Sequence, residues 1–273
     1  MPGVTTGIQH LNCATLRPPA AYLPGLMPSE LVAHCLVVEG PAGLTLVDTG
    51  FGTDDVHEQG RRLGRPFVLM VGARFDAAQP AVVQLRSLGY QPTDVRDIVL
   101  THLDLDHAGG LADFPHARVH VHTRELEAAL HPSLRDRQRY IADQWAHGPD
   151  WVEHEPGGDE WFGFESVQAV GDDVVMVPLH GHTQGHCGVA VRRPSGGWLL
   201  HAGDAFFHTG DKESPRACPP GLRLFQRVMA ADGEARRANL ARLQDLHAHH
   251  RDEVTVFSAH DRSEFEALRT AAV

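Results

Sequence analysis

Short apolar runs alternate with helical patterns along most of the chain. Residues 31–38 and 44–47 are apolar runs on either side of a turn that contains glycine and proline, a pattern typical of a β-hairpin. Similar runs predict further strands at residues 97–100, 118–121, 174–177, 188–191, 198–201 and 254–257. Amphipathic spacing predicts helices at residues 80–89, from Thr123 to Leu130, after a cap at Asp232, and at 264–271. This alternation favours an α/β fold.

One long segment, residues 131–173, does not follow this alternation. It is irregular and rich in glycine and in aromatic residues: Tyr140, Trp145, Trp151, Trp161, Phe162 and Phe164. A connection of this length usually carries a function of its own. We therefore expect a lid or substrate wall here, with a peripheral packed insertion as the alternative.

Composition narrows the class of protein. The chain has 273 residues, 42% of them hydrophobic and 22% charged, as expected of one globular domain that spans residues 1–273. The formal net charge of −11 has the wrong sign for a nucleic-acid partner. Neither a signal peptide nor a membrane span is recognisable, and the four cysteines form no C-x-x-C pair. We expect a cytoplasmic protein with reduced thiols and no membrane partner.

Ligand-type side chains follow the predicted strand at 97–100. His102, Asp104, Asp106 and His107 lie within six positions, and Gly109 and Gly110 allow a tight turn behind them. The apolar residues between them can point into the core while the polar set faces a cavity. Imidazoles and carboxylates that converge in this way favour a divalent metal site.

Three later segments also place histidine or aspartate residues just after predicted strands. They are Gly181-His182-Thr183-Gln184-Gly185-His186, Gly203-Asp204 and Ala259-His260-Asp261. Buried ionisable groups need a partner or a metal, so these segments support one another. Asp48 also follows a strand, where a role at the site and a capped turn are both open.

The order of these motifs resembles the metallo-β-lactamase superfamily of metal-dependent hydrolases. The resemblance covers residues 31–260, and the segments His10-Leu11-Asn12-Cys13 and Ala259-His260-Asp261 look most like the branch that contains the acyl-homoserine lactonases. It implies a four-layer αβ/βα sandwich with a dinuclear metal site at one edge. The ligands it implies are His102, Asp104 and His186 for the first metal, Asp106, His107 and His260 for the second, and Asp204 bridging both. It implies that His182 orients a ligand.

Asp104 stands where most members of this family have histidine. With two divalent ions, three carboxylates and a bridging hydroxide, the inner site would be neutral, whereas the common motif would leave one positive charge. Carboxylates suit harder ions than imidazole does. We therefore expect a shift from zinc towards iron or manganese, and a weaker effect of the metals on the pKa of bound water.

The function predicted from these features is hydrolysis of an ester, lactone or thioester of a small, partly apolar organic substrate. The bridging hydroxide would attack the carbonyl, with Asp106 orienting it. The lactonase branch has a tyrosine near the bridging aspartate, whereas here Asp204 is followed by Ala205, Phe206, Phe207 and His208, so His208 is the candidate donor in its place. The alternatives are an iron-dependent redox enzyme and a metal-containing binding or regulatory protein. Either a monomer or a homodimer is expected.

Overall fold

The strands of the described residues form two sheets that pack face to face. The computed structural model describes residues 5–59, 61–155, 157, 159–213 and 217–271. The first sheet contains, in spatial order, β4 (Ala73–Arg74), β1 (Gly7–Leu16), β2 (Leu31–Gly40), β3 (Gly43–Val47), β5 (Val95–Val99), β6 (Arg118–His122) and β7 (Asp150–His154). The second contains β13 (Val254–Phe257), β12 (Trp198–His201), β11 (Cys187–Arg192), β10 (Val174–Pro178), β9 (Phe164–Val170) and β8 (Asp159–Trp161).

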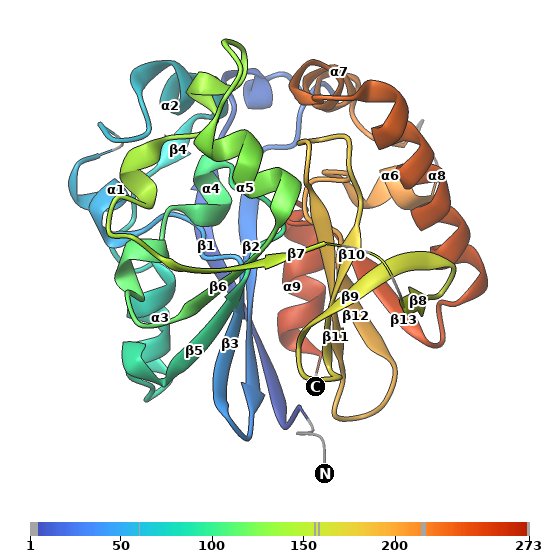
Figure 1. The fold of residues 1–273 in the computed structure, drawn as a ribbon. Coiled ribbons are helices and arrows are strands. Elements are labelled where there is room, and N and C mark those ends of the chain that lie inside the picture. Colours follow the sequence, from blue (N-terminus) through green and yellow to red (C-terminus); the bar gives the residue numbers. More distant parts are fainter. Residues whose placement is uncertain (1–4, 60, 156, 158, 214–216, 272–273) are drawn as a thin grey trace.

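Helices cover the outer faces of both sheets (Figure 1). The α-helices of the described residues are α1 (Thr53–His57), α2 (Arg65–Val71), α3 (Ala81–Ser87), α4 (Leu105–Ala108), α5 (Thr123–Leu130), α6 (Thr209–Glu213), α7 (Pro220–Met229), α8 (Gly233–His249) and α9 (Arg262–Thr270). Short 3-10 helices lie at Pro19–Tyr22, Pro92–Asp94, Leu111–Asp113, Asp136–Gln138 and Ala142–Gln144. This is the predicted four-layer αβ/βα sandwich.

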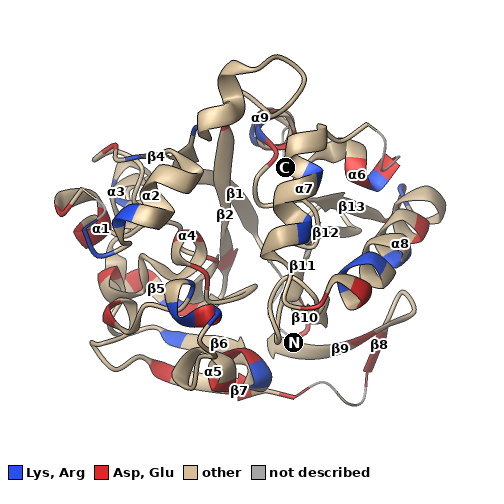
Figure 2. Ribbon diagram, turned by 90° about the horizontal axis from the view of Figure 1, so that it is seen from above, with Lys and Arg blue, Asp and Glu red and all other residues tan. Residues whose placement is uncertain are grey.

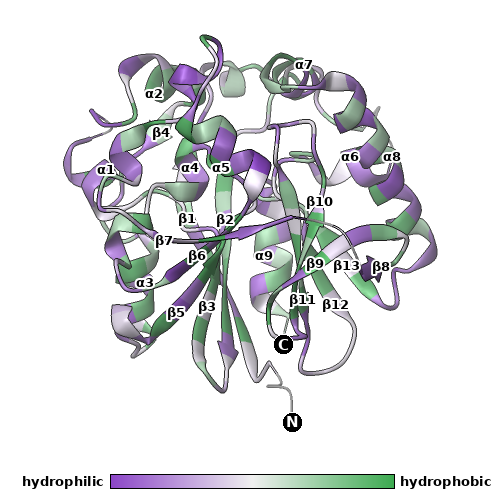
Figure 3. Ribbon diagram, viewed as in Figure 1, coloured by the Kyte–Doolittle hydropathy of each residue, from purple (hydrophilic) through white to green (hydrophobic). Residues whose placement is uncertain are grey.

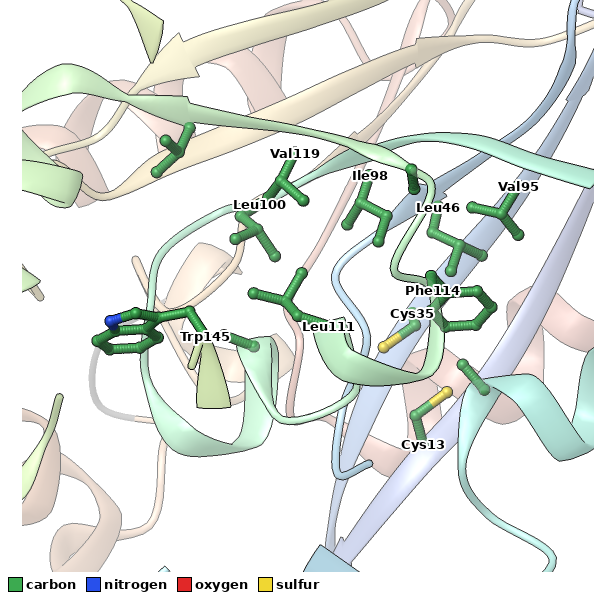
Figure 4. Packing of buried hydrophobic residues seen from close by; sticks show 14 of the residues in the cluster. Cys13, Cys35, Leu46, Val95, Ile98, Leu100, Leu111, Phe114, Val119 and Trp145 are labelled. Atoms are coloured by element: carbon green, nitrogen blue, oxygen red, sulfur yellow. The ribbon is translucent and has the colours of Figure 1, made fainter. Parts of the chain in front are cut away.

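Three apolar layers hold the sandwich together. Between the sheets, side chains of β2 and β3 such as Val38 and Val47 pack with Met176 and Val189 of the second sheet. Outside the first sheet, α3 and the residues around Leu111 and Phe114 cover the strands. Figure 4 shows Leu111 and Phe114 close to the strand residues Ile98 and Leu46. Outside the second sheet, the leucines of α8 do the same. The inner strands are accordingly mostly hydrophobic, whereas the edge strands β7 and β8 and the outer faces of the helices are hydrophilic (Figure 3).

The predicted strands and helices are all present, with small changes at their ends. The β2–β3 hairpin is antiparallel, and Asp232 caps α8 by accepting hydrogen bonds from Glu234 N and Ala235 N. The cap of α5 is His122 rather than Thr123, because the His122 Nδ1 atom accepts from Arg124 N. β1 was not predicted, because its buried and partly exposed positions do not alternate cleanly. The amphipathic helices α2 and α7 were not predicted either.

Residues 131–173 are not an insertion outside the sandwich. Their later part supplies β7 at the edge of the first sheet, and then β8 and β9 at the edge of the second. Their aromatic side chains mostly pack in the cores: Tyr140 and Trp145 in the first outer core, Trp161 and Phe164 in the second. Within the described part of the chain, no helix has both the length and the apolar character that a membrane span requires.

Candidate metal centre

The ligand-type side chains predicted from the sequence gather at one edge of the sandwich. β3, β5, β10, β12 and β13 all end there, and the loops that follow them carry Asp48, the segment 101–107, the segment 179–186, Asp204 and His260. Asp106 and His107 belong to the short helix α4, which begins at Leu105 and lies at this edge (Figure 1). Parallel strands β3, β5 and β12, β13 place their carboxyl ends side by side, and this brings distant segments together.

The first group of ligand atoms comes from His102, Asp104, His182 and Asp204. The His182 Nε2 atom lies 2.9 Å from Asp104 Oδ2 and 3.3 Å from Asp204 Oδ2. The His102 Nε2 atom lies 3.5 Å from Asp104 Oδ2 and 3.8 Å from Asp204 Oδ2. All four residues are buried.

The second group comes from Asp106, His107 and His260, and Asp204 joins it to the first. The Asp204 Oδ1 atom lies 3.3 Å from His107 Nε2 and 3.0 Å from His260 Nε2. The His260 Nε2 atom lies 3.8 Å from Asp106 Oδ2. One oxygen of Asp204 thus faces each group, which is the geometry of a bridging carboxylate.

These groups fit two divalent cations. A tetrahedral site with bonds of about 2.0–2.1 Å to nitrogen and oxygen separates its ligand atoms by about 3.3 Å. The distances of 2.9 to 3.8 Å within the two groups lie around that value. The buried atoms His102 Nε2, His107 Nε2 and Asp204 Oδ1 have no hydrogen-bond partner among the described residues, as expected of atoms directed at a metal.

Hydrogen bonds to the other ring nitrogen fix the orientation of three histidines. His107 Nδ1 donates to Asp48 Oδ2 over 2.8 Å, and His260 Nδ1 donates to Val32 O over 2.7 Å. His102 Nδ1 donates to the Thr101 hydroxyl, which in turn donates to Asp48. With Nδ1 engaged in this way, each imidazole directs its Nε2 atom at the site. Asp48 thus helps to orient the ligand histidines. Its backbone has a left-handed conformation (φ of 56°), which is rare for residues other than glycine.

The two histidines of the Gly181–His186 segment exchange the roles expected from the sequence, where His186 was the ligand and His182 the orienting residue. His182 belongs to the first group, whereas His186 lies outside both. The His186 Nδ1 atom donates to Leu179 O over 3.0 Å, and its Nε2 atom accepts from Asp204 N over 2.8 Å. Since both ring nitrogens are used, His186 has none left for a metal. It holds the backbone of the bridging aspartate, and the sequence-based assignment of His186 as a ligand is corrected to His182.

Glu125 is a buried acid that the sequence analysis did not identify. Its Oε1 atom accepts from Leu103 N and the Tyr140 hydroxyl, both over 3.0 Å. Its Oε2 atom accepts from the Thr183 hydroxyl over 2.6 Å and from Gly185 N over 2.9 Å. Gly185 is needed there, because a Cβ atom would lie 2.2 Å from Glu125 N. Glu125 thereby ties the loop of the first sheet to that of the second.

Charges in the site act on one another strongly. Burial opposes ionisation of Asp104, yet the Arg139 guanidinium and His102 hold its pKa well below the usual range. Burial likewise opposes ionisation of Asp204, and His260 and His107 hold its pKa well below the usual range. Burial lowers the pKa of His182 to about 4. Burial also opposes ionisation of His107 and His260, yet the Asp204 carboxylate raises the pKa of both. The carboxylates thus draw positive charge to the site, which suits a cation.

An apolar cavity opens directly above the ligand atoms. Asp104, Asp106, His182, Asp204 and His260 form its polar floor. Its walls come from the segment before β2, from α2, from Phe207 and from α7; the side chains are those of Leu16, Pro18, Met27, Leu31, Phe67, Met70, Val71, Phe207, Phe225 and Met229. The view onto this edge in Figure 2 shows α2 and α7 on either side of β1 and β2.

The expected substrate wall, as far as its residues are described, and the expected donor His208 are not among the residues that line this cavity, so both roles stay predictions. The aromatic residues of segment 131–173 do not line this cavity, although Arg135, Asp136, Gln138 and Arg139 line an adjoining one that shares Asp104. His208 lines a neighbouring cavity, and its Nδ1 atom accepts from Gly210 N over 2.9 Å. The three tyrosines of the chain, all described, do not line the cavity above the ligands either.

Comparison with known proteins agrees with this geometry. Residues 29–247 match the family model described as the metallo-beta-lactamase superfamily. The protein named "Probable metallo-hydrolase Rv2300c" of Mycobacterium tuberculosis (strain ATCC 25618 / H37Rv) is 42% identical over 274 residues, covering 99% of this chain and 85% of the relative. The N-acyl homoserine lactonase AttM of Azorhizobium caulinodans is 30% identical over 193 residues, 70% of each chain.

Solved structures show the same fold. A structure of an N-acyl homoserine lactone hydrolase with the product N-hexanoyl-L-homoserine at its catalytic metal centre superimposes with a TM-score of 0.73. The alignment covers 97% of this chain and 96% of that one at 21% sequence identity. At this identity the likeness establishes the architecture, while the function rests on the site itself.

Proposed function

The chain belongs to the metallo-β-lactamase superfamily, and we propose that it is a metal-dependent hydrolase that cleaves an ester, lactone or thioester with an apolar acyl part. One observation carries this proposal: two groups of buried ligand atoms share Asp204 and form the floor of a cavity whose walls are apolar. A small organic substrate can bury its acyl chain against those walls while its carbonyl reaches the floor. The relationship to N-acyl homoserine lactonases supports the same reaction class.

The two groups of ligand atoms would each hold one divalent cation. His102, Asp104, His182 and Asp204 would hold one divalent cation, and Asp106, His107 and His260, together with Asp204, the other. When bound, such cations polarise a carbonyl and favour ionisation of water at neutral pH.

Asp106 is the residue we assign to proton transfer. It is on the floor of the cavity, 7% exposed, where its carboxylate can take a proton from the attacking water. The water oxygen bonds to the carbonyl carbon, the bond from that carbon to the alkoxy or thio group breaks, and Asp106 returns the proton to the leaving group. The products are a carboxylic acid and an alcohol or thiol.

The proposal includes the partner, the oligomeric state and the cellular location of the protein. Its partner would be a small molecule rather than nucleic acid or membrane, and the protein would act as a monomer or homodimer. All four cysteines are free and buried, which supports the proposed cytoplasmic location because a reducing compartment keeps thiols in this state.

The test is a panel of chromogenic esters, lactones and thioesters with acyl chains of two to ten carbons, assayed in parallel with metal analysis. We expect hydrolysis that a chelator abolishes and divalent metal restores. Asp106→Asn should reduce kcat by about a hundredfold or more, because proton transfer contributes on that order, and it should also weaken metal binding by the second group, to which Asp106 belongs. Asp172→Asn, at an exposed turn between β9 and β10, is the matched control.

Two outcomes would contradict the proposal. A protein that holds two metals and hydrolyses none of the panel would point to a binding or regulatory role. Oxygen consumption by an iron-loaded protein, with no hydrolysis, would point to redox chemistry.

A further inference from the structure

Asp104 has different neighbours on its two oxygens. The Oδ2 atom faces the first ligand group, 2.9 Å from His182 Nε2. The Oδ1 atom lies 3.1 Å from the Nε atom of Arg139 in an ion pair. The side chains are only 11% and 7% exposed, so solvent screens the attraction between them weakly.

Three different elements hold the Arg139 guanidinium in place. Besides its ion pair with Asp104, it donates from one terminal nitrogen to His182 O over 2.8 Å and from the other to Met229 O over 2.7 Å. Asp104 and His182 are ligands of the first group, and Met229 lines the cavity. The three guanidinium nitrogens thus contact three different residues. Rotation of the group would break several of these contacts at once.

We propose that Arg139 is a positioning residue that gives Asp104 the charge and the single coordinating atom of a histidine. The inference rests on the proposed function, because it concerns the metals of that site. A lone carboxylate brings a full negative charge and two oxygens to a metal. Arg139 supplies the compensating positive charge and engages one oxygen, so the pair presents one oxygen and no net charge to the site.

This pairing changes the expectation drawn from Asp104 alone. With Asp104 alone, the inner site carries one unit of positive charge less than a site with the common His-x-His-x-Asp-His motif. Arg139 restores that unit from a segment 35 positions along the chain, and no local pattern around Asp104 reveals it. The preference for iron or manganese over zinc should accordingly be smaller than the carboxylate by itself implies.

The experiment is a double-variant cycle of Asp104→His and Arg139→Gln, read as metal content per chain after dialysis against a weak chelator. Asp104→His alone restores the common motif but leaves the buried Arg139 cation unpaired beside two dications. We expect it to weaken binding of one of the two ions by about tenfold or more, the usual scale for a lost partner of a ligand. Adding Arg139→Gln should recover the affinity, because it removes the unpaired charge.

A second readout uses Arg139→Gln alone. Asp104 then regains its full charge and both oxygens, so binding competition between Mn²⁺ and Zn²⁺ should shift by about tenfold towards Mn²⁺. The matched control is Arg135→Gln. Arg135 also donates to carbonyls at the end of α7, Val228 O and Ala230 O, and the ion pair with Asp104 is made by Arg139 instead.

The possible outcomes separate the two proposals. If the wild type holds two ions and Asp104→His holds them equally well with or without Arg139, the inference is overturned and the proposed function stands. If Arg139→Gln adds to the loss in Asp104→His instead of reversing it, Arg139 has a structural role only, and the inference is again overturned. A wild type that binds no divalent metal overturns both.

Discussion

At the scale of single residues, the function of a histidine here depends on which ring nitrogen is left free. His102, His107 and His260 each donate from Nδ1 to an oxygen and keep Nε2 for the site. His186 has the same burial but uses both nitrogens. Burial and residue type are thus not enough to identify a ligand, whereas the hydrogen-bond partners are.

This difference gives the first prediction. His182→Ala should lose about one metal ion per chain, because it removes one nitrogen of the first group. His186→Ala should keep both ions but unfold more easily, by about 1–3 kcal/mol, because Asp204 N and Leu179 O lose their partner inside the protein. Metal analysis and denaturant unfolding measure the two effects. Loss of an ion from His186→Ala with retention in His182→Ala would reverse the assignment.

Glu125 provides a second prediction at this scale. In Glu125→Gln, one carboxylate oxygen becomes an amide nitrogen, which cannot accept from Gly185 N or, in the other orientation, from Leu103 N. We expect a loss of about 2–4 kcal/mol in the free energy of unfolding, together with weaker metal retention. Glu127→Gln, exposed on the same helix, is the control and should change the stability by less than about 0.5 kcal/mol. Equal stability of the two variants would show that the four hydrogen bonds of Glu125 are dispensable.

The sequence allowed part of this site to be predicted, for a physical reason. His102, Asp104, Asp106 and His107 belong to one short loop after a buried strand, so local geometry alone converges them. The choice between His182 and His186 depends on hydrogen bonds to Leu179 and to the distant Asp204, which no local pattern reveals. The roles of Glu125 and Arg139 could not be predicted from the sequence either. An acid in a helix and a basic residue in an irregular segment usually face solvent.

At the scale of elements, the fold was predictable where a strand is mostly apolar and buried, as β12 and β13 are. The short strands β7, β8 and β9 were missed because their residues are largely exposed or half-buried. α2 and α7, also missed, turn out to form the walls of the cavity. Their apolar residues face the space above the ligands, and Leu69, Leu224 and Val228 on the other faces are exposed.

The cavity walls predict how the enzyme selects acyl chains. Each buried methylene contributes about 0.8 kcal/mol, so kcat/KM in the wild type should rise by about fourfold per carbon until the cavity is filled. Met70→Trp on α2 should narrow the cavity and reduce kcat/KM for octanoyl esters about tenfold relative to acetyl esters. Leu69→Trp, on the same helix but 70% exposed, should leave the ratio unchanged. A Met70 variant with the wild-type ratio would place the acyl chain elsewhere.

α1 carries a carboxyl group whose ionisation should destabilise the fold. Burial raises the pKa of Asp55 from 3.8 to about 6, although Gly52 N donates to it. A folded-state pKa above the unfolded value means that its contribution to stability is present below pH 4 and lost as the pH rises to about 6. Asp55→Asn should therefore be more stable than the wild type at pH 7.5, by at most about 3 kcal/mol, with the difference vanishing near pH 4.

The control for this prediction is the neighbouring Asp54→Asn, whose side chain is 61% exposed. Thermal unfolding of the two variants and the wild type between pH 4 and 7.5 measures the effect. A stability difference between Asp55→Asn and the wild type that does not vary with pH would mean that the carboxyl group does not titrate in this range.

At the scale of the whole molecule, the site joins the two halves of the sandwich. His102, Asp104, Asp106 and His107 follow a strand of the first sheet, whereas His182, Asp204 and His260 follow strands of the second. Glu125 and Arg139 also connect the two sides, since both contact the His182 segment from the first half. A metal held by both sets can bind only when the sheets are packed together.

Metal removal should therefore destabilise the entire fold rather than one loop. A ligand that binds only the folded state stabilises it by about 4 kcal/mol at a thousandfold excess over its Kd. We expect calorimetry to show a single transition whose Tm falls when the metal is removed and returns when it is restored. Asp173→Asn, at the opposite ends of the strands, weakens the contacts of Asp173 with Thr5 N and Arg192. It should lower Tm with and without metal by similar amounts, because distant sites add independently. An unchanged Tm in the metal-free protein would show that the sheets hold the ligand atoms in place without help from the cations.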